Sequence, residues 1–236
     1  MKKNLVSVVL ILAAFIAGAY IFRAATKPTP IPNPFPTQSR AHLPFEEFVK
    51  KLAAIPTITT RFRQAASPTE ATGIGFEISQ SGLKRLDDAQ LAKWMELNVK
   101  LVEFLDERTC ATLARADPTA ARAQSAKILP AIEKLSSTDI RAYFDLTLNS
   151  VTAELNGTPP PDFSKDKAER AMRKLVKKFS PEEQALLLRV SLYPSTASDS
   201  SACWIVKTVF AEIMDLPAED RRVLSRLFTQ PSNGRT

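Results

Sequence analysis

Residues 179–192 read FSPEEQALLLRVSL, and this stretch shows how the chain builds its structure. Ser180 is placed to cap a helix, Pro181 suits the first helical position, and Glu183 completes a capping box. Most of the residues that follow are good helix formers. The pattern therefore predicts a helix over 181–193.

The same kind of helix start recurs along the chain, with an apolar residue, a capping residue and acidic residues in the first turn. It appears at 86–88, 135–139 and 216–220. The expected helices are 44–55, 88–107, 109–116, 119–129, 138–156, 165–179, 181–193, 200–215 and 218–229. Glycine occurs only 6 times in 236 residues, and apolar and polar residues rarely alternate, which argues against a sheet. The predicted fold class is all-α.

Two of these helices carry apolar stripes suited to a core. The stripe of 88–107 consists of Leu91, Trp94, Met95, Leu101, Val102 and Leu105. The stripe of 200–215 consists of Cys203, Val206, Phe210 and Ile213. Residues 57–86 contain several glycines and allow no prediction of their conformation.

An apolar segment, residues 5–22, precedes the helical part and contains no charge. As a helix it would be about 27 Å long, close to the thickness of a hydrocarbon core. Lys2, Lys3 and Arg23 flank it, so we expect a transmembrane signal-anchor after a short cytoplasmic tail, residues 1–4. The alternative is a signal peptide cleaved near Ala19, which would leave a secreted or periplasmic protein.

Prolines dominate the segment that follows, and occupy every second position from Pro28 to Pro36. Proline favours extended geometry for itself and for the residue before it, so residues 23–42 are expected to form a linker that acts as a stalk. The globular domain then spans 43–230 and contains about eight or nine helices. The run Asn156–Pro161 divides it into possible halves, 43–156 and 164–230, and a disordered tail is expected at 231–236.

The positive charge of the chain is no argument for nucleic-acid binding. Four of the 32 basic residues are Lys2, Lys3, Arg23 and Lys27, which flank the apolar segment. Without them the excess over the 25 acidic residues is only three. Nucleic-acid-binding domains gather their basic residues on one face, so we expect no nucleic-acid partner.

The two cysteines, Cys110 and Cys203, fit an exported chain. A disulfide between them would close a loop of about 90 residues and join the two expected halves. The alternative is a pair of buried thiols that pack as small apolar groups.

The sequence contains no recognisable catalytic constellation. His42 is the only histidine and lies beside the linker, which argues against a histidine triad or a histidine-rich metal site. No CxxC, P-loop or GxSxG motif occurs, so neither a metal nor a cofactor is expected. A lone glutamate can act as a general acid, and Glu77 is the candidate by its position in the glycine-containing stretch.

Two segments are candidates for binding. The expected helix 165–179 carries basic residues opposite an apolar side, and these would contact an acidic partner or lipid headgroups. The proposed contacts are Arg170, Arg173, Lys174, Lys177 and Lys178.

The second candidate segment is Arg141–Leu148, where Arg141, Phe144, Asp145 and Leu148 match the pattern R-x-x-F-D-x-x-L. This resembles the core motif of the lipase-specific foldases, although Leu146 stands where a tyrosine is expected. Those foldases also have an N-terminal anchor, a low-complexity linker and a helical periplasmic body. The resemblance implies a chaperone for an exported enzyme, while a helix with one polar and one apolar side would explain the same residues.

The expected function is that of a non-enzymatic, membrane-anchored helical module that binds another envelope or exported protein. It would be a single-pass protein of a bacterial inner membrane with its helical domain in the periplasm. An envelope-complex subunit and an immunity-type inhibitor both fit. The alternatives are the foldase-like chaperone and a carboxylate-dependent cell-wall enzyme, for which we expect a pocket around Glu77.

Overall fold

The computed structural model describes residues 33–115 and 127–229. These ranges consist of helices and their connections, and they contain no strand, so the all-α prediction is confirmed for them. No helix within them is both long enough and apolar enough to cross a membrane. The expected anchor 5–22, most of the linker and the tail 231–236 lie outside the described residues, as does most of the expected helix 119–129.

The described residues divide into two compact units, each built from two separate stretches of chain. We call residues 87–115 and 161–229 unit 1, and residues 33–86 and 127–160 unit 2. The sequence led us to expect continuous halves, 43–156 and 164–230. The structure differs because residues 87–115 pack with the C-terminal helices rather than with their neighbours in the chain.

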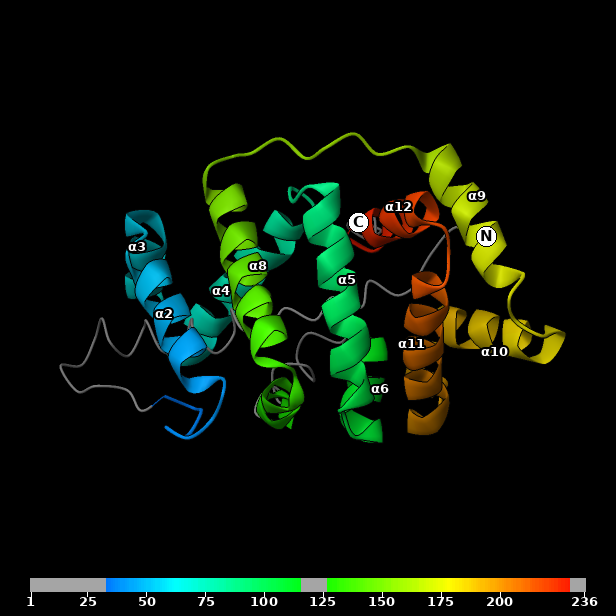
Figure 1. Ribbon diagram of the computed structural model, residues 1–236, viewed down its shortest axis with the longest axis horizontal. Coiled ribbons are helices and arrows are strands. Elements are labelled where there is room, and N and C mark those ends of the chain that lie inside the picture. Colours follow the sequence, from blue (N-terminus) through cyan, green and yellow to red (C-terminus); the bar gives the residue numbers. More distant parts are fainter. Residues whose placement is uncertain (1–32, 116–126, 230–236) are drawn as a thin grey trace. The chain divides into compact units, whose positions relative to one another are not determined.

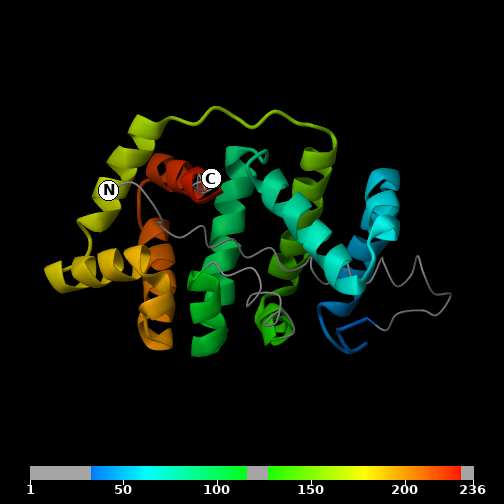
Figure 2. The same cartoon turned by 180° about the vertical axis from the view of Figure 1, so that it is seen from behind.

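Unit 2 contains α2 (His42–Ala53), α3 (Pro56–Gln64), α4 (Pro68–Leu83) and α8 (Ser137–Leu155). Residues 127–134 of this unit are also helical. Both α2 and α4 pack against α8, and α3 contacts α2 and α4 (Figure 1). Seen from behind, α4 runs diagonally across α8 (Figure 2).

A cluster of aromatic rings forms much of the core of unit 2. Phe144 of α8 stacks on Phe48 of α2 with 5.4 Å between ring centroids, and its edge-to-face partner Phe45 lies at 5.7 Å. Phe35 adds a further ring at 5.5 Å from Phe45 and is only 1% exposed. Residue 35 belongs to the expected linker, so the end of that linker is part of the folded unit. The reason is local: the Asn33 side chain donates to the His42 carbonyl and accepts from the Phe35 amide.

The stretch whose conformation could not be predicted, 57–86, is mostly helical. The start of α4 has the same chemistry as the start of 181–193. Ser67 accepts a hydrogen bond from the Glu70 amide, and a proline follows the cap. These capping interactions stabilise the helix start despite the glycines farther along.

Unit 1 contains α5 (Asp88–Glu103), α6 (Glu107–Ala114), α9 (Lys165–Val176) and α10 (Pro181–Leu192). A short 3₁₀ turn, η1 (Pro194–Thr196), leads to α11 (Asp199–Met214) and then to α12 (Ala218–Thr229). In Figure 1, α5 and α11 lie side by side, and α10 contacts α11 at one end and extends away from it. The main contact of α6 is with α11, and α12 contacts both α5 and α9.

The predicted core faces of unit 1 are confirmed. Every residue of the two predicted stripes is buried, with at most 6% of its surface exposed, and all of them lie on α5 or α11 except Leu105, which follows α5. The capping box at Ser180 is also confirmed: its hydroxyl accepts from the Glu183 amide at 3.3 Å, and the Glu183 carboxylate accepts from the Ser180 amide at 2.8 Å.

The disulfide between Cys110 and Cys203 is present, with 5.0 Å between the two Cα atoms. It joins α6 to α11, which belong to the same unit. The expected disulfide is therefore confirmed, but its expected role of joining two halves is not. The bridge is a link inside unit 1, because α6 packs directly against α11.

Candidate interaction surface

The solvent-facing side of α10 carries a row of uncharged residues. Pro181, Ala185, Leu188 and Leu192 are all exposed, and their spacing of four, three and four residues places them on one side of the helix. Leu188 and Leu192 are each 48% exposed, and Tyr193, directly after the helix, is 60% exposed. We call Pro181, Ala185, Leu188 and Leu192 the α10 row.

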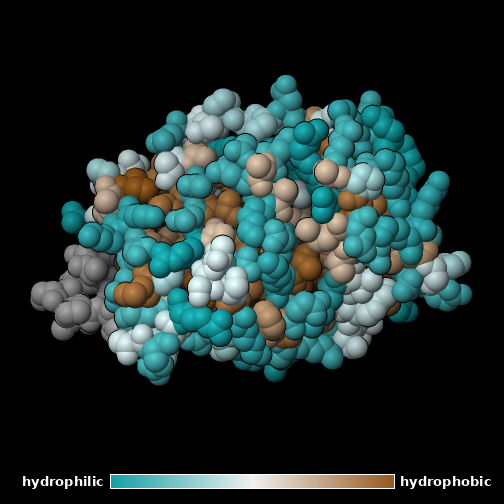
Figure 3. All heavy atoms as spheres, in the orientation of Figure 1, coloured by the Kyte–Doolittle hydropathy of each residue, from teal (hydrophilic) through white to brown (hydrophobic). Residues whose placement is uncertain are grey.

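The opposite side of α10 is buried in unit 1 and carries the apolar residues Leu187 and Val190, together with Ser191. A surface helix normally presents charged or polar residues to water, and a helix that is apolar all round is normally covered. Most of the face drawn in Figure 3 is hydrophilic, as expected for such helices. The α10 row therefore has the character of a contact surface.

Two charged residues lie along one edge of the α10 row. Glu182 and Arg189 are exposed and are separated by two turns, so they lie on the same side of the helix. Neither side chain has a hydrogen bond or ion pair to a described residue. Both charges are therefore open to an external partner.

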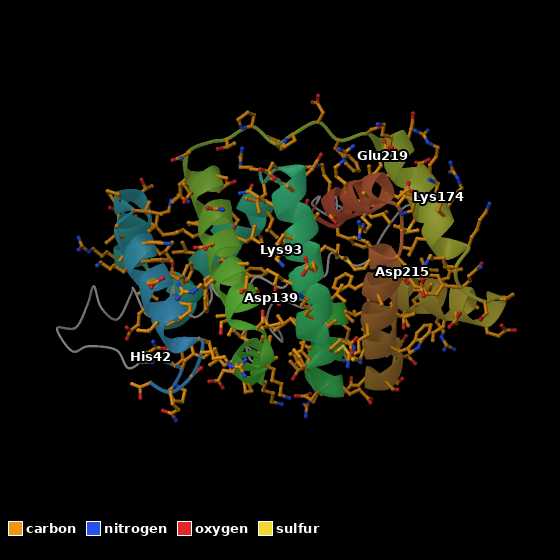
Figure 4. The ribbon with its side chains drawn as sticks, in the orientation of Figure 1. His42, Lys93, Asp139, Lys174, Asp215 and Glu219 are labelled. Atoms are coloured by element: carbon orange, nitrogen blue, oxygen red, sulfur yellow. A yellow bond between two sulfur atoms is a disulfide. The ribbon has the colours of Figure 1, made fainter. Side chains whose placement is uncertain are left out.

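The five basic residues proposed as contacts lie on α9 or directly after it, and they separate into two groups. Lys174, labelled in Figure 4, donates to Asp220 of α12 at 2.7 Å, and Lys178 lies 2.6 Å from Glu212. The hydrogen bond from Lys178 to Glu212 raises the pKa of this lysine. These two lysines neutralise acidic residues of their own unit, so they are not free for a partner.

Arg170, Arg173 and Lys177 form the other group. They are exposed, and their spacing places them on the outward side of α9. No ion pair joins them to any described residue. The predicted basic surface of α9 is thus reduced to three cations.

The residues that match the foldase motif are explained by packing within unit 2. Phe144 is 2% exposed in the aromatic core. Arg141 and Asp145 lie one turn apart on the surface of α8, where they pair with Glu47 at 3.2 Å and Lys51 at 3.4 Å on α2. Leu148 is half-buried. These contacts hold α2 against α8 and need no partner protein.

An open pocket of about 450 Å³ lies over α3, α4 and α8 in unit 2. Its lining residues are Arg61, Gln64, Glu70, Ile74, Glu77, Ile78, Ser81 and Glu154. The pocket expected around Glu77 is therefore present. Glu77 itself is exposed to solvent, whereas a carboxyl that acts as a general acid is usually desolvated by apolar neighbours.

Glu154, at one end of this pocket, is a structural carboxylate. Burial raises the pKa of Glu154. Hydrogen bonds from Arg85 and Ser81 and the positive charge of Arg85 together lower it by more, so the pKa is below its ordinary value. The Arg85 Nε atom lies 2.6 Å from the carboxylate, and the same guanidinium donates to the Thr158 carbonyl. Glu154 is therefore ionised and fixes the C-terminal ends of α4 and α8 to each other.

His42 also has a structural position. Its Nδ1 atom lies 2.7 Å from the Phe35 carbonyl, and its Nε2 atom lies 3.2 Å from Glu46, one turn farther along α2. Among the described residues, no group of three or more histidine, cysteine, aspartate or glutamate side chains is arranged to hold a metal ion.

Sequence reasoning found the basic helix but missed the α10 row. The available signal was the run Leu186-Leu187-Leu188. Three consecutive residues span about 200° around a helix, so they cannot all face one core.

A comparison with models of protein families, with curated proteins and with solved structures found no match for this chain.

Proposed function

We propose that this chain is a membrane-tethered helical module that binds another protein of the bacterial envelope and performs no catalysis. The α10 row is the observation that carries this proposal, because an uncharged outward side of a surface helix is best explained by a partner that covers it. Glu182 and Arg189 add charged groups along one edge of the apolar row, as at the rim of a protein interface.

The proposed tether consists of residues 5–22, with the helical units in the periplasm. The expected linker, residues 23–42, follows this segment, and its end belongs to unit 2, because Phe35 is buried there. Alkaline washing of membranes and mass determination of the chain test this arrangement. An intact N-terminus in the washed membrane fraction supports the anchor, and a chain that begins near residue 20 would show cleavage instead.

The binding proposal is tested with the full-length chain solubilised from membranes. The double variant Leu188→Glu, Leu192→Glu places charge on the α10 row without changing the buried side of the helix. We expect the wild-type chain to retain a stoichiometric protein partner and the variant to lose it. Ser195→Glu, a change at an exposed residue just beyond α10, is the matched control and should retain the partner.

Protein partners counted in this experiment include a second copy of the chain that carries a different tag. Formation of the Cys110–Cys203 disulfide and an unchanged helical circular dichroism spectrum show that each variant is folded. Equal recovery of partners by the double variant and the wild type would refute the assignment of the α10 row as the binding surface.

The pocket around Glu77 is the observation in favour of a second candidate, a carboxylate-dependent cell-wall enzyme. It supplies a concave site of a size that small ligands occupy. Release of soluble fragments from purified peptidoglycan by the wild-type chain, and its loss in Glu77→Gln, would support this candidate. The same measurement with no release by either protein would remove it.

A further inference from the structure

We propose that the partner covering the α10 row is a second copy of this chain, with the two α10 helices packed antiparallel across a two-fold axis. This inference rests on the proposed function, since it names the partner of the same surface. Its basis is that both the shape and the charge of α10 are complementary to themselves in this orientation.

The shape argument concerns the sizes of the residues along the row. Ala185 is small and lies between the bulkier Pro181 and Leu188, with Leu192 at the far end. In an antiparallel pair centred near Ala185, each Leu188 lies beside the alanine of the other helix, and each Leu192 lies toward the other Pro181. Large residues then meet small or flat ones, which is the arrangement that lets two helices pack closely.

The charge argument concerns Glu182 and Arg189. In an antiparallel pair related by a two-fold axis, the same edge of both helices meets, and the residues before the midpoint face those after it. Glu182 and Arg189 lie on one edge of the row, at about equal distances on either side of the midpoint near Ala185. Each glutamate therefore faces the arginine of the other copy, which gives two identical ion pairs.

A parallel arrangement does not have this property. In a parallel pair the two-fold axis runs along the helices, so the charged edges of the two copies lie on opposite sides of the contact, and neither Glu182 nor Arg189 meets its counterpart or an opposite charge of this edge. The charges on the edge of the row therefore select the antiparallel pair. They also explain why both side chains lack an ion pair within the described part of their own chain.

The size of the contact indicates where the pair forms. A helix of 12 residues is about 18 Å long, and one such pair covers less than the roughly 800 Å² per partner of an ordinary stable interface. Confinement of both copies to one membrane by the proposed anchor raises their effective concentration. We therefore expect self-association of the tethered chain in membranes.

The main test places a cysteine at the centre of the pair in the full-length chain. Cys110 and Cys203 are bridged to each other, and the sequence has no other cysteine, so Ala185→Cys introduces a single free thiol. Non-reducing electrophoresis of membranes should show a disulfide-linked dimer for this variant. Ser195→Cys, at an exposed position beyond the expected contact, should remain monomeric.

Charge exchange tests the antiparallel orientation in the Ala185→Cys background. Glu182→Lys and Arg189→Glu should each reduce the yield of the cross-linked dimer by about tenfold, because each creates two repulsive contacts. The double exchange restores opposite charges across the axis and should restore the yield. Failure of the double variant to recover would overturn the proposed orientation.

Two outcomes of the main test would overturn self-association: no cross-link with Ala185→Cys, or equal cross-linking with Ser195→Cys. The latter would show that collisions or the N-terminal segment, and not α10, bring the copies together. If a different protein is still lost from the Leu188→Glu, Leu192→Glu variant in that case, the proposed function stands and only the identity of its partner is wrong.

Discussion

At the scale of single residues, Arg141 and Phe144 of α8 have opposite environments although they lie within one turn. Phe144 contacts three other phenylalanine rings in the core of unit 2, and it is 2% exposed. Arg141 is exposed, and its ion pair with Glu47 is open to solvent. The foldase-like pattern in the sequence therefore combines a core residue with surface residues.

This contrast predicts unequal effects on stability. Phe144→Ala should lower the free energy of unfolding by about 3–5 kcal/mol because it leaves a cavity among the rings. Arg141→Ala should change it by less than about 1 kcal/mol because exposed ion pairs contribute little. Urea denaturation followed by circular dichroism measures both. A chaperone assay is therefore informative with Arg141→Ala, since Phe144→Ala is expected to damage the fold itself.

A second residue-scale prediction concerns Glu154 and pH. Its pKa in the folded chain is below the ordinary value of 4.5, so the folded state binds this proton less tightly than the unfolded state. The resulting stabilisation is complete above pH 4.5 and is lost as the pH falls through the lower, folded-state pKa. Glu154→Gln should be less stable than the wild type near pH 7, and the difference should shrink near pH 3.

Hydrogen exchange of α8 amides at several pH values follows this change within unit 2. Glu77→Gln alters a carboxylate that lines the same pocket but has no ion pair to a described residue, so it provides the control. A stability difference between wild type and Glu154→Gln that is independent of pH would contradict the assigned ion pair with Arg85.

At the scale of secondary-structure elements, Gly82 determines how closely α4 approaches α8. A Cβ atom placed at Gly82 would lie 1.8 Å from the Ser150 carbonyl oxygen, so the two helices touch through their backbones at this point. A side chain of any size would force them apart. Gly157, which follows α8 with a φ of 64°, has nothing within 4 Å of an added Cβ atom.

We therefore expect Gly82→Ala to destabilise unit 2 by about 3 kcal/mol or more, through a clash with backbone that cannot rotate away. Gly157→Ala should cost about 1–2 kcal/mol, the price of a left-handed backbone conformation for an L-residue. Thermal unfolding of both variants compares the two effects. An equal loss of stability would show that α4 and α8 are not in backbone contact.

The elements themselves were largely predictable, because helix starts are local. Ser180, Asp87 and Ser136 cap helices where the sequence indicates them, through hydrogen bonds to residues three positions later. Residues 56–83 were missed because their glycines suggested irregular structure. The capping signal at Ser67–Glu70 was the same as at Ser180–Glu183. A glycine is required at position 82 because α8, which is remote in the sequence, packs directly against it.

At the scale of the whole molecule, the chain passes between its two units more than once. Residues 87–115 leave unit 2 and join unit 1, and the disulfide then connects Cys110 to Cys203 within unit 1. Both tryptophans of the chain, Trp94 and Trp204, belong to unit 1. Tryptophan fluorescence therefore reports on this unit alone.

We expect reduction of the disulfide to destabilise unit 1 by up to about 4 kcal/mol, because the bridge closes a loop of 93 residues. The urea midpoint measured by tryptophan fluorescence should fall, while hydrogen exchange of α8 in unit 2 should change much less. The double variant Cys110→Ala, Cys203→Ala, which cannot be reduced further, is the control. Equal effects on the two units would argue against a bridge that acts within unit 1.

The sequence by itself determined the all-α class, the helix starts and the pair of cysteines, because these depend on residues close together in the chain or on composition. Only the tertiary structure decided that α5 and α6 pack with α11 and α12, that the disulfide lies inside one unit, and which lysines of α9 are already paired. It also decided which apolar side of α10 is buried and which faces solvent. These outcomes depend on contacts between distant segments, and no local pattern specifies them.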